Sequence, residues 1–147
     1  MKTVVIGIGN LLRCDDGAGV HVVNFLKSKN TKVDAHDLTM GSIDIIELIR
    51  GYDRAYIIDA IKTGAEPGTV FKINIHHNEE PPVIHSSHGV DLFTTLKLAE
   101  ELYPEELPNE IIVFGIEAQD LITLNMECTE PVRKAIKEIA QYIQNHL

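Results

Sequence analysis

The sequence predicts an α/β fold: a three-layer sandwich in which helices flank a twisted, mostly parallel sheet of about five strands. Short apolar runs without polar alternation, such as the one that begins at Val4, are typical of parallel strands buried on both faces. These runs alternate with segments of helical apolar spacing, which favours strands joined by right-handed crossovers. Residues 1–147 are expected to form a single domain, large enough to bury a substantial core.

In the first part of the chain, apolar runs indicate strands, and apolar residues three and four positions apart indicate helices. Gly7, Gly9 and Asn10 follow the first run, where a sharp exit from the sheet needs positive φ or close backbone approach. Ser42 is typical of the start of a helix, and Gly51 is typical of its end. The predicted elements are a strand from Val4, a helix from Gly17 to about Lys29, a strand over 32–38, a helix that Ser42 caps and Gly51 ends, and a strand over 54–58.

The second part of the chain contains a strand of a different kind. Residues 70–75 alternate apolar and polar side chains, which predicts a half-exposed strand at an edge of the sheet, with antiparallel pairing as one option. Pro67 and Gly68 predict a type II turn before it. The remaining elements are a polar loop over 76–87, a helix over 89–102, a strand over 111–116, an irregular loop over 117–128 and a helix that opens at Thr129-Glu130-Pro131.

The composition narrows the class of partner. The net charge of −9 argues against nucleic acid and anionic membranes, because both favour clustered lysine and arginine. No apolar run approaches the length of a membrane span, and the N-terminal segment lacks a signal-peptide cleavage site. Cys14 and Cys128 lack the paired spacing of a zinc site or a disulfide framework. We therefore expect a cytoplasmic protein with reduced thiols, no nucleic-acid partner and no membrane insertion.

Polar side chains gather where the predicted strands end. In open α/β sheets the functional crevice lies at the carboxyl ends of the strands, so these side chains can converge. Two carboxylates and an imidazole from three separate loops predict an open metal site that leaves positions for substrate or water. This donor set does not choose among zinc, iron, nickel and manganese. The candidates are Asp15, Asp16, Asp59, His85, His88 and Glu117.

Other interpretations remain open at this point. Asp16 precedes a helix and suits its N-cap, and His88 could cap the next helix in the same way. A Rossmann-like nucleotide binder is disfavoured, because residues 7–12 lack the third glycine of the fingerprint and the aspartates that follow would repel a pyrophosphate. A nucleophilic role for Cys14 is disfavoured, because neighbouring carboxylates raise the pKa of a thiol.

Several segments match a known family in the same order along the chain. Residues 7–19 follow the pattern Gly-x-Gly-Asn-x-Leu-x-x-Asp-(Asp/Glu)-Gly-x-Gly. With these segments, nearly the whole chain resembles the hydrogenase maturation proteases, the nickel-dependent endopeptidases of [NiFe]-hydrogenase assembly. The further matching segments are 57–60, 67–69, 87–88, 115–117 and 129–132.

The resemblance implies that Asp16, Asp59 and His88 bind nickel and form the catalytic site, and that Gly41 binds substrate. Only Gly41 carries over from the family's Asp-Gly-Gly-Thr segment, since residues 39–42 read Thr-Met-Gly-Ser. The resemblance also implies a metal-dependent peptidase, of aspartic type by class, without an organic cofactor.

The resemblance further implies that nickel arrives within the substrate, the precursor of a [NiFe]-hydrogenase large subunit, whose C-terminal extension is then removed. By hypothesis, the metal polarises the scissile carbonyl or activates water. The alternative from another class is a non-catalytic chaperone that checks the metal of the same precursor.

Overall fold

Strands and helices alternate along most of the chain. The computed structural model describes residues 1–29, 32–39, 44–75 and 92–147. The elements are β1 (Thr3–Ile8), the 3-10 helix η1 (Cys14–Gly17), α1 (Ala18–Ser28), β2 (Asp34–Leu38), α2 (Asp44–Ile49), β3 (Arg54–Ile61), β4 (Val70–Ile75), α3 (Leu92–Leu102), β5 (Glu110–Glu117) and α4 (Glu130–Asn145).

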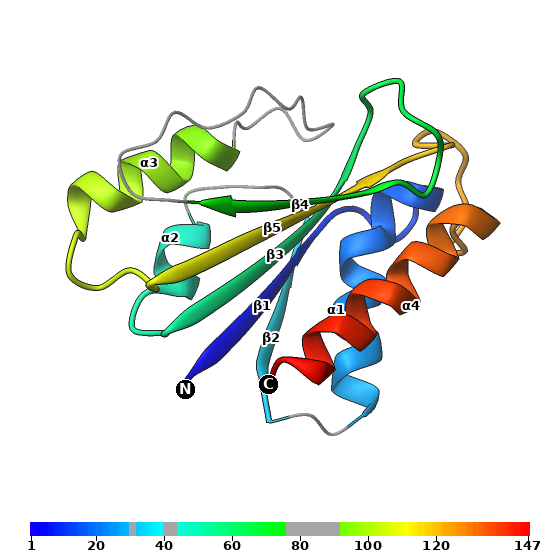
Figure 1. Ribbon diagram of the computed structural model, residues 1–147. Coiled ribbons are helices and arrows are strands. Elements are labelled where there is room, and N and C mark those ends of the chain that lie inside the picture. The colour runs from blue at the N-terminus through cyan, green and yellow to red at the C-terminus, as the bar shows by residue number, and fades with distance from the viewer. Residues whose placement is uncertain (30–31, 40–43, 76–91) are drawn as a thin grey trace.

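The strands form one five-stranded sheet in the order β2-β1-β3-β5-β4 (Figure 1). Neighbouring strands run parallel except for β4, which pairs antiparallel with β5 at the edge. The predicted edge strand and its antiparallel option are therefore confirmed. The turn before β4 is also confirmed: Gly68 has a φ of 87°, and the Thr69 amide donates to the Glu66 carbonyl at 3.1 Å.

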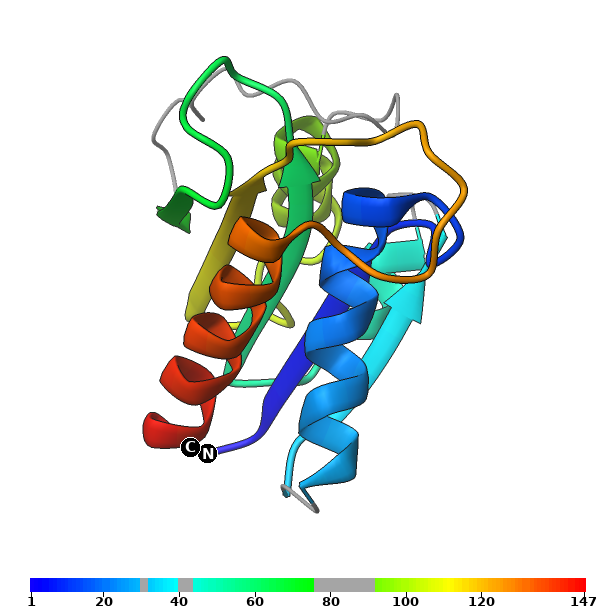
Figure 2. The same ribbon diagram turned by 90° about the vertical axis from the view of Figure 1, so that its right-hand side faces the viewer.

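Helices cover both faces of the sheet and complete the three-layer sandwich. α1 and α4 pack side by side on one face, and α2 and α3 lie on the other (Figures 1 and 2). The alternation of strand side chains serves both layers: Tyr56 of β3 faces α1 and α4, whereas Ile57 faces α2 and α3. The central strands β1 and β3 are buried on both faces, as their apolar sequences predict.

Glycines in the N-terminal motif allow α1 to pack closely on β1 and β3. A Cβ atom on Gly7 would lie 2.1 Å from the Gly19 carbonyl oxygen, and one on Gly19 would lie 2.4 Å from the Ile58 carbonyl oxygen. These close approaches confirm that the motif serves backbone packing. The positive φ values of this motif fall at Gly9 (151°) and Cys14 (47°), and Asn10 has none.

Two boundaries differ from the sequence-based prediction. β3 does not end before Asp59, because it continues to pair with β5 as far as Ile61. Asp16 lies within η1, and Gly17 is the N-cap of α1, so Asp16 does not cap that helix. Gly41, Ser42, Gly89 and the whole 76–87 loop lie outside the described residues. Within the described chain, no helix combines the length and apolarity needed to cross a membrane.

Candidate functional site

The sheet has a topological switch point between β1 and β3. The chain leaves β1 through α1 on one face to reach β2, and returns through α2 on the other face to reach β3. At such a point the two crossovers diverge and leave a crevice beyond the carboxyl ends of the strands. Asp16 follows β1, Asp59 lies near the end of β3, and η1 contacts β3. Two of the three predicted nickel ligands therefore belong to elements in contact at this switch point.

Asp16 is held by the exit of β1. Its side chain is buried, and its Oδ2 atom accepts a hydrogen bond from the Asn10 backbone amide at 3.1 Å. Its own amide donates to the Arg13 carbonyl at 2.9 Å. The Asp16 carbonyl also packs against Gly9, where a Cβ atom would approach it to 1.9 Å. Gly9 and Asn10 therefore fix the position of this carboxylate within the motif.

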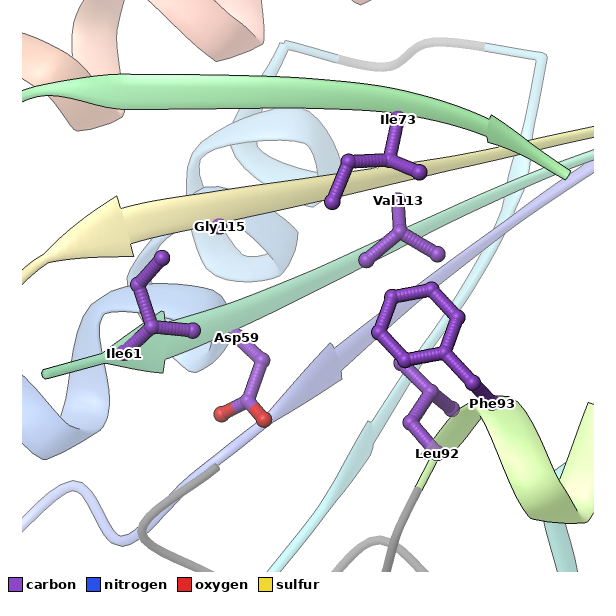
Figure 3. Close-up of a pocket in the computed structure, with 7 residues that line it drawn as sticks. All are labelled: Asp59, Ile61, Ile73, Leu92, Phe93, Val113 and Gly115. Carbon is purple, nitrogen blue, oxygen red and sulfur yellow. The ribbon is translucent and has the colours of Figure 1, made fainter. Parts of the chain in front are cut away.

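Asp59 faces a small cavity on the α2 and α3 side of the sheet. The cavity has a volume of about 20 Å³, enough for roughly one water molecule. Figure 3 shows the Asp59 carboxylate projecting from β3 on the side where the first residues of α3 lie. Asp59 is buried, and an ionised carboxylate among apolar groups needs compensation from a hydrogen bond or a cation. The other described residues of the cavity are Ile61, Ile73, Leu92, Phe93, Val113 and Gly115.

The remaining predicted site residues, His88 and Gly41, lie outside the described residues, as does His85. Leu92 lines the same cavity as Asp59, and His88 precedes Leu92 by four residues. Four residues span at most about 14 Å. The convergence of His88 with the two aspartates stays a prediction. In the described part of the chain, no three His, Cys, Asp or Glu side chains come together as a metal site.

Asp15 serves as an anchor for the 118–129 loop. It is fully buried, and its Oδ2 atom accepts from the backbone amides of Gln119 and Asp120 at 2.8 and 2.9 Å. Its Oδ1 atom accepts from the Thr129 amide at 2.7 Å, and the Thr129 hydroxyl also donates to this carboxylate. The adjacent aspartates thus differ in role: Asp15 joins η1 to the segment before α4.

Glu117 is likewise committed to a loop. It is the last residue of β5 and is buried. Both of its carboxylate oxygens accept from the Thr63 backbone amide at 3.0 Å, and the Thr63 hydroxyl donates to it as well. Glu117 therefore holds the segment that follows β3. Asp15 and Glu117 thus each hold a loop, whereas Asp16 and Asp59 lie on the contacting elements η1 and β3 at the switch point.

The two thiols are buried and poorly suited to act as nucleophiles. Burial, followed by the negative charge of Asp15, raises the pKa of the Cys14 thiol above its usual 9.0. The same two causes raise the pKa of the Cys128 thiol to about 12. Because the thiolate is the reactive form, both groups are protonated and unreactive near neutral pH. This agrees with the prediction made from the neighbouring carboxylates.

Comparison with known sequences finds one family along most of the chain. The sequence profile of a family described as hydrogenase maturation protease matches residues 20–146. The hydrogenase expression/formation protein HoxM of Azotobacter vinelandii is 28% identical over 140 residues, covering 91% of this chain and 66% of HoxM. The protein HupD of Rhizobium leguminosarum bv. viciae is 30% identical over 145 residues, covering 92% of this chain and 68% of HupD. The chain therefore spans about two thirds of the length of these relatives.

Solved structures show the same fold. The [NiFe] hydrogenase maturation protease HybD from Thermococcus kodakarensis superposes with a TM-score of 0.78 at 25% identity, covering 99% of this chain and 98% of that one. The hydrogenase maturating endopeptidase HybD from E. coli superposes with a TM-score of 0.75 at 20% identity, covering 97% and 90% of the two chains. These similarities confirm the predicted α/β sandwich over almost the entire length.

Proposed function

Because the chain belongs to the hydrogenase maturation protease family, we propose that it is an endopeptidase acting on the immature large subunit of a [NiFe]-hydrogenase. In this proposal it recognises nickel in that precursor and removes a C-terminal extension. The observation that carries the proposal is the pair of buried carboxylates, Asp16 and Asp59, on contacting elements at the switch point of the sheet.

The proposed nickel ligands are Asp16, Asp59 and His88. Two carboxylates largely removed from water attract a divalent cation, which in turn offsets the cost of burying their charge. Three protein ligands leave coordination positions for substrate or water. Such an open site can test whether the precursor carries its metal without retaining it. Nickel is accordingly part of the substrate, and no organic cofactor is proposed.

The proposed chemistry needs no nucleophile from this chain. A bound metal can polarise the scissile carbonyl or lower the pKa of a water molecule that attacks it. The two aspartates hold the metal, so the aspartic-type class refers here to ligands rather than to a pair that shares a proton. Gly41 is proposed to contact substrate, and it follows β2, whose Leu38 carbonyl accepts from the Gly9 amide at 2.8 Å.

We also propose that the protein acts in the cytoplasm. Cys14 and Cys128 are buried neighbours, since the Cys128 thiol donates to the Cys14 carbonyl oxygen at 3.4 Å, and they form no disulfide. Two neighbouring reduced thiols are typical of proteins that work in a reducing compartment. The proposed partner, a hydrogenase large-subunit precursor, would be met there before its assembly is complete.

The test is incubation of the purified protein with precursor that does or does not contain nickel, followed by intact mass measurement. Loss of a C-terminal segment is expected only from the nickel-loaded precursor. Asp16→Asn and His88→Ala are expected to abolish this loss while the thermal unfolding midpoint is unchanged. His146→Ala, which alters a histidine next to the C-terminus, is the control and is expected to process normally.

The possible results separate the enzyme from its alternative. Complex formation without any change in mass would support the non-catalytic chaperone. Cleavage that is equally fast without nickel, or that persists in His88→Ala, would contradict the proposed metal site.

A further inference from the structure

Four large apolar side chains beside η1 are exposed to solvent. Leu12, Ile122, Leu124 and Met126, here called the apolar rim, are between 55% and 86% exposed. They come from two segments that are far apart in sequence but paired in space. The Asn125 amide donates to the Leu12 carbonyl at 3.0 Å. The Cys14 amide donates to the Asn125 carbonyl at 2.8 Å, so the rim adjoins the start of η1. Figure 2 shows the 118–129 segment running beside η1.

The backbone that carries the rim is held by side-chain hydrogen bonds. The Asp120 carboxylate accepts hydrogen bonds from the backbone amides of Ile122 and Thr123 at 2.9 Å, and these two bonds fix the turn. The Asn125 side chain accepts from the Glu127 amide at 2.9 Å. The apolar groups are therefore presented on an ordered loop. Little backbone conformational entropy therefore remains to be lost when a partner covers them.

The loop that carries the rim is hydrogen-bonded to η1, the element that contains Asp16. Asp15 binds the amides of Gln119 and Asp120 at the start of the loop, and it adjoins Asp16 in η1. A large ligand whose metal reaches Asp16 therefore lies next to the rim. The net charge of −9 disfavours a second copy of the chain, nucleic acid or an anionic membrane as its partner. Exposed apolar side chains that gather on paired segments are typical of protein interaction sites.

We propose that the apolar rim is the docking surface for the folded body of the precursor large subunit, through an apolar, non-acidic face of that protein. This inference rests on the proposed function and adds to it a contact outside the metal site. The scissile segment and its metal would engage η1 and β3, while the body of the substrate covers the rim. Recognition would then combine metal coordination with apolar burial.

The test compares two surface double variants. Ile122→Ser/Leu124→Ser removes the most exposed part of the rim. Leu98→Ser/Leu102→Ser, at positions 40% and 55% exposed on α3, is the matched control. Binding of nickel-loaded precursor is measured by biolayer interferometry, and its cleavage by initial rates. The rim variant is expected to bind about tenfold more weakly and to show a correspondingly higher KM. The control should match the wild type in both assays.

Each outcome separates this inference from the proposed function. Wild-type cleavage with an unchanged KM in the rim variant overturns the docking surface and leaves the protease intact. Binding that depends on the rim without any cleavage supports the docking surface and overturns the protease. A wild-type dimer that the rim variant converts to monomer in sedimentation overturns the inference, because a second copy would then cover the rim. Absence of both binding and cleavage overturns both proposals.

Discussion

Replacing Asp15 is expected to destabilise the fold strongly, because its carboxylate joins η1 to the 118–129 loop. In Asp15→Ala, the backbone amides of Gln119, Asp120 and Thr129 lose their acceptor. Each buried donor left unsatisfied costs about 1–3 kcal/mol, so the free energy of unfolding should fall by at least about 3 kcal/mol. Asp15→Asn keeps one oxygen but turns an NH2 group toward at least one of these amides. Its expected cost is therefore smaller, about 1–3 kcal/mol.

Urea denaturation at pH 7, analysed by linear extrapolation, measures these costs. Asp37→Asn, an exposed position on β2, is the control and is expected to lie within about 0.5 kcal/mol of the wild type. The expected order of stability is wild type and Asp37→Asn together, then Asp15→Asn, then Asp15→Ala. An Asp15→Ala protein within about 1 kcal/mol of the wild type would refute the assignment of Asp15 as the loop anchor.

Three further predictions address packing, ionisation and chemistry. Gly19→Ala should lower the free energy of unfolding by about 3 kcal/mol, because the added Cβ would press on backbone atoms. Gly51→Ala is the control, with open space around it but a positive φ, and should cost about 1 kcal/mol. Equal costs in urea denaturation would contradict the close packing of α1. Burial raises the pKa of the Cys128 thiol from 9.0 to about 12, so above pH 9.0 the unfolded chain loses this proton before the folded protein does. The free energy of unfolding should therefore fall as the pH rises, by about 1 kcal/mol at pH 10. A Cys128→Ala protein whose stability falls equally steeply at alkaline pH would disprove this. Asp59→Asn should abolish precursor processing and leave thermal unfolding intact, and retained processing would exclude Asp59 as a ligand.

The fold could be predicted from the sequence because local patterns of apolar and polar residues indicate which faces of each strand are buried. The apolar runs of β1 and β3 indicate burial on both faces, and the alternation over 70–75 indicates an exposed edge. The extent of β3 was not predictable in this way. Asp59 interrupts the apolar run, and only pairing with β5 carries the strand on to Ile61.

The separate roles of Asp15 and Asp16 were also beyond the sequence. The two residues are adjacent and chemically identical, so no local pattern distinguishes an anchor from a ligand. The distinction comes from Thr129, which lies 114 positions away and binds Asp15. Glu117 is similar, because its role depends on Thr63 in another loop. Positions of carboxylates at strand ends could be predicted, whereas the hydrogen bonds that occupy them depend on tertiary contacts.

The most direct test of the central claim is anomalous X-ray diffraction from crystals of the protein soaked in a nickel salt. One strong nickel peak is expected within about 2.5 Å of a carboxylate oxygen of Asp16, a carboxylate oxygen of Asp59 and an imidazole nitrogen of His88. A nickel ion bound elsewhere, or bound without one of these three side chains, would contradict it.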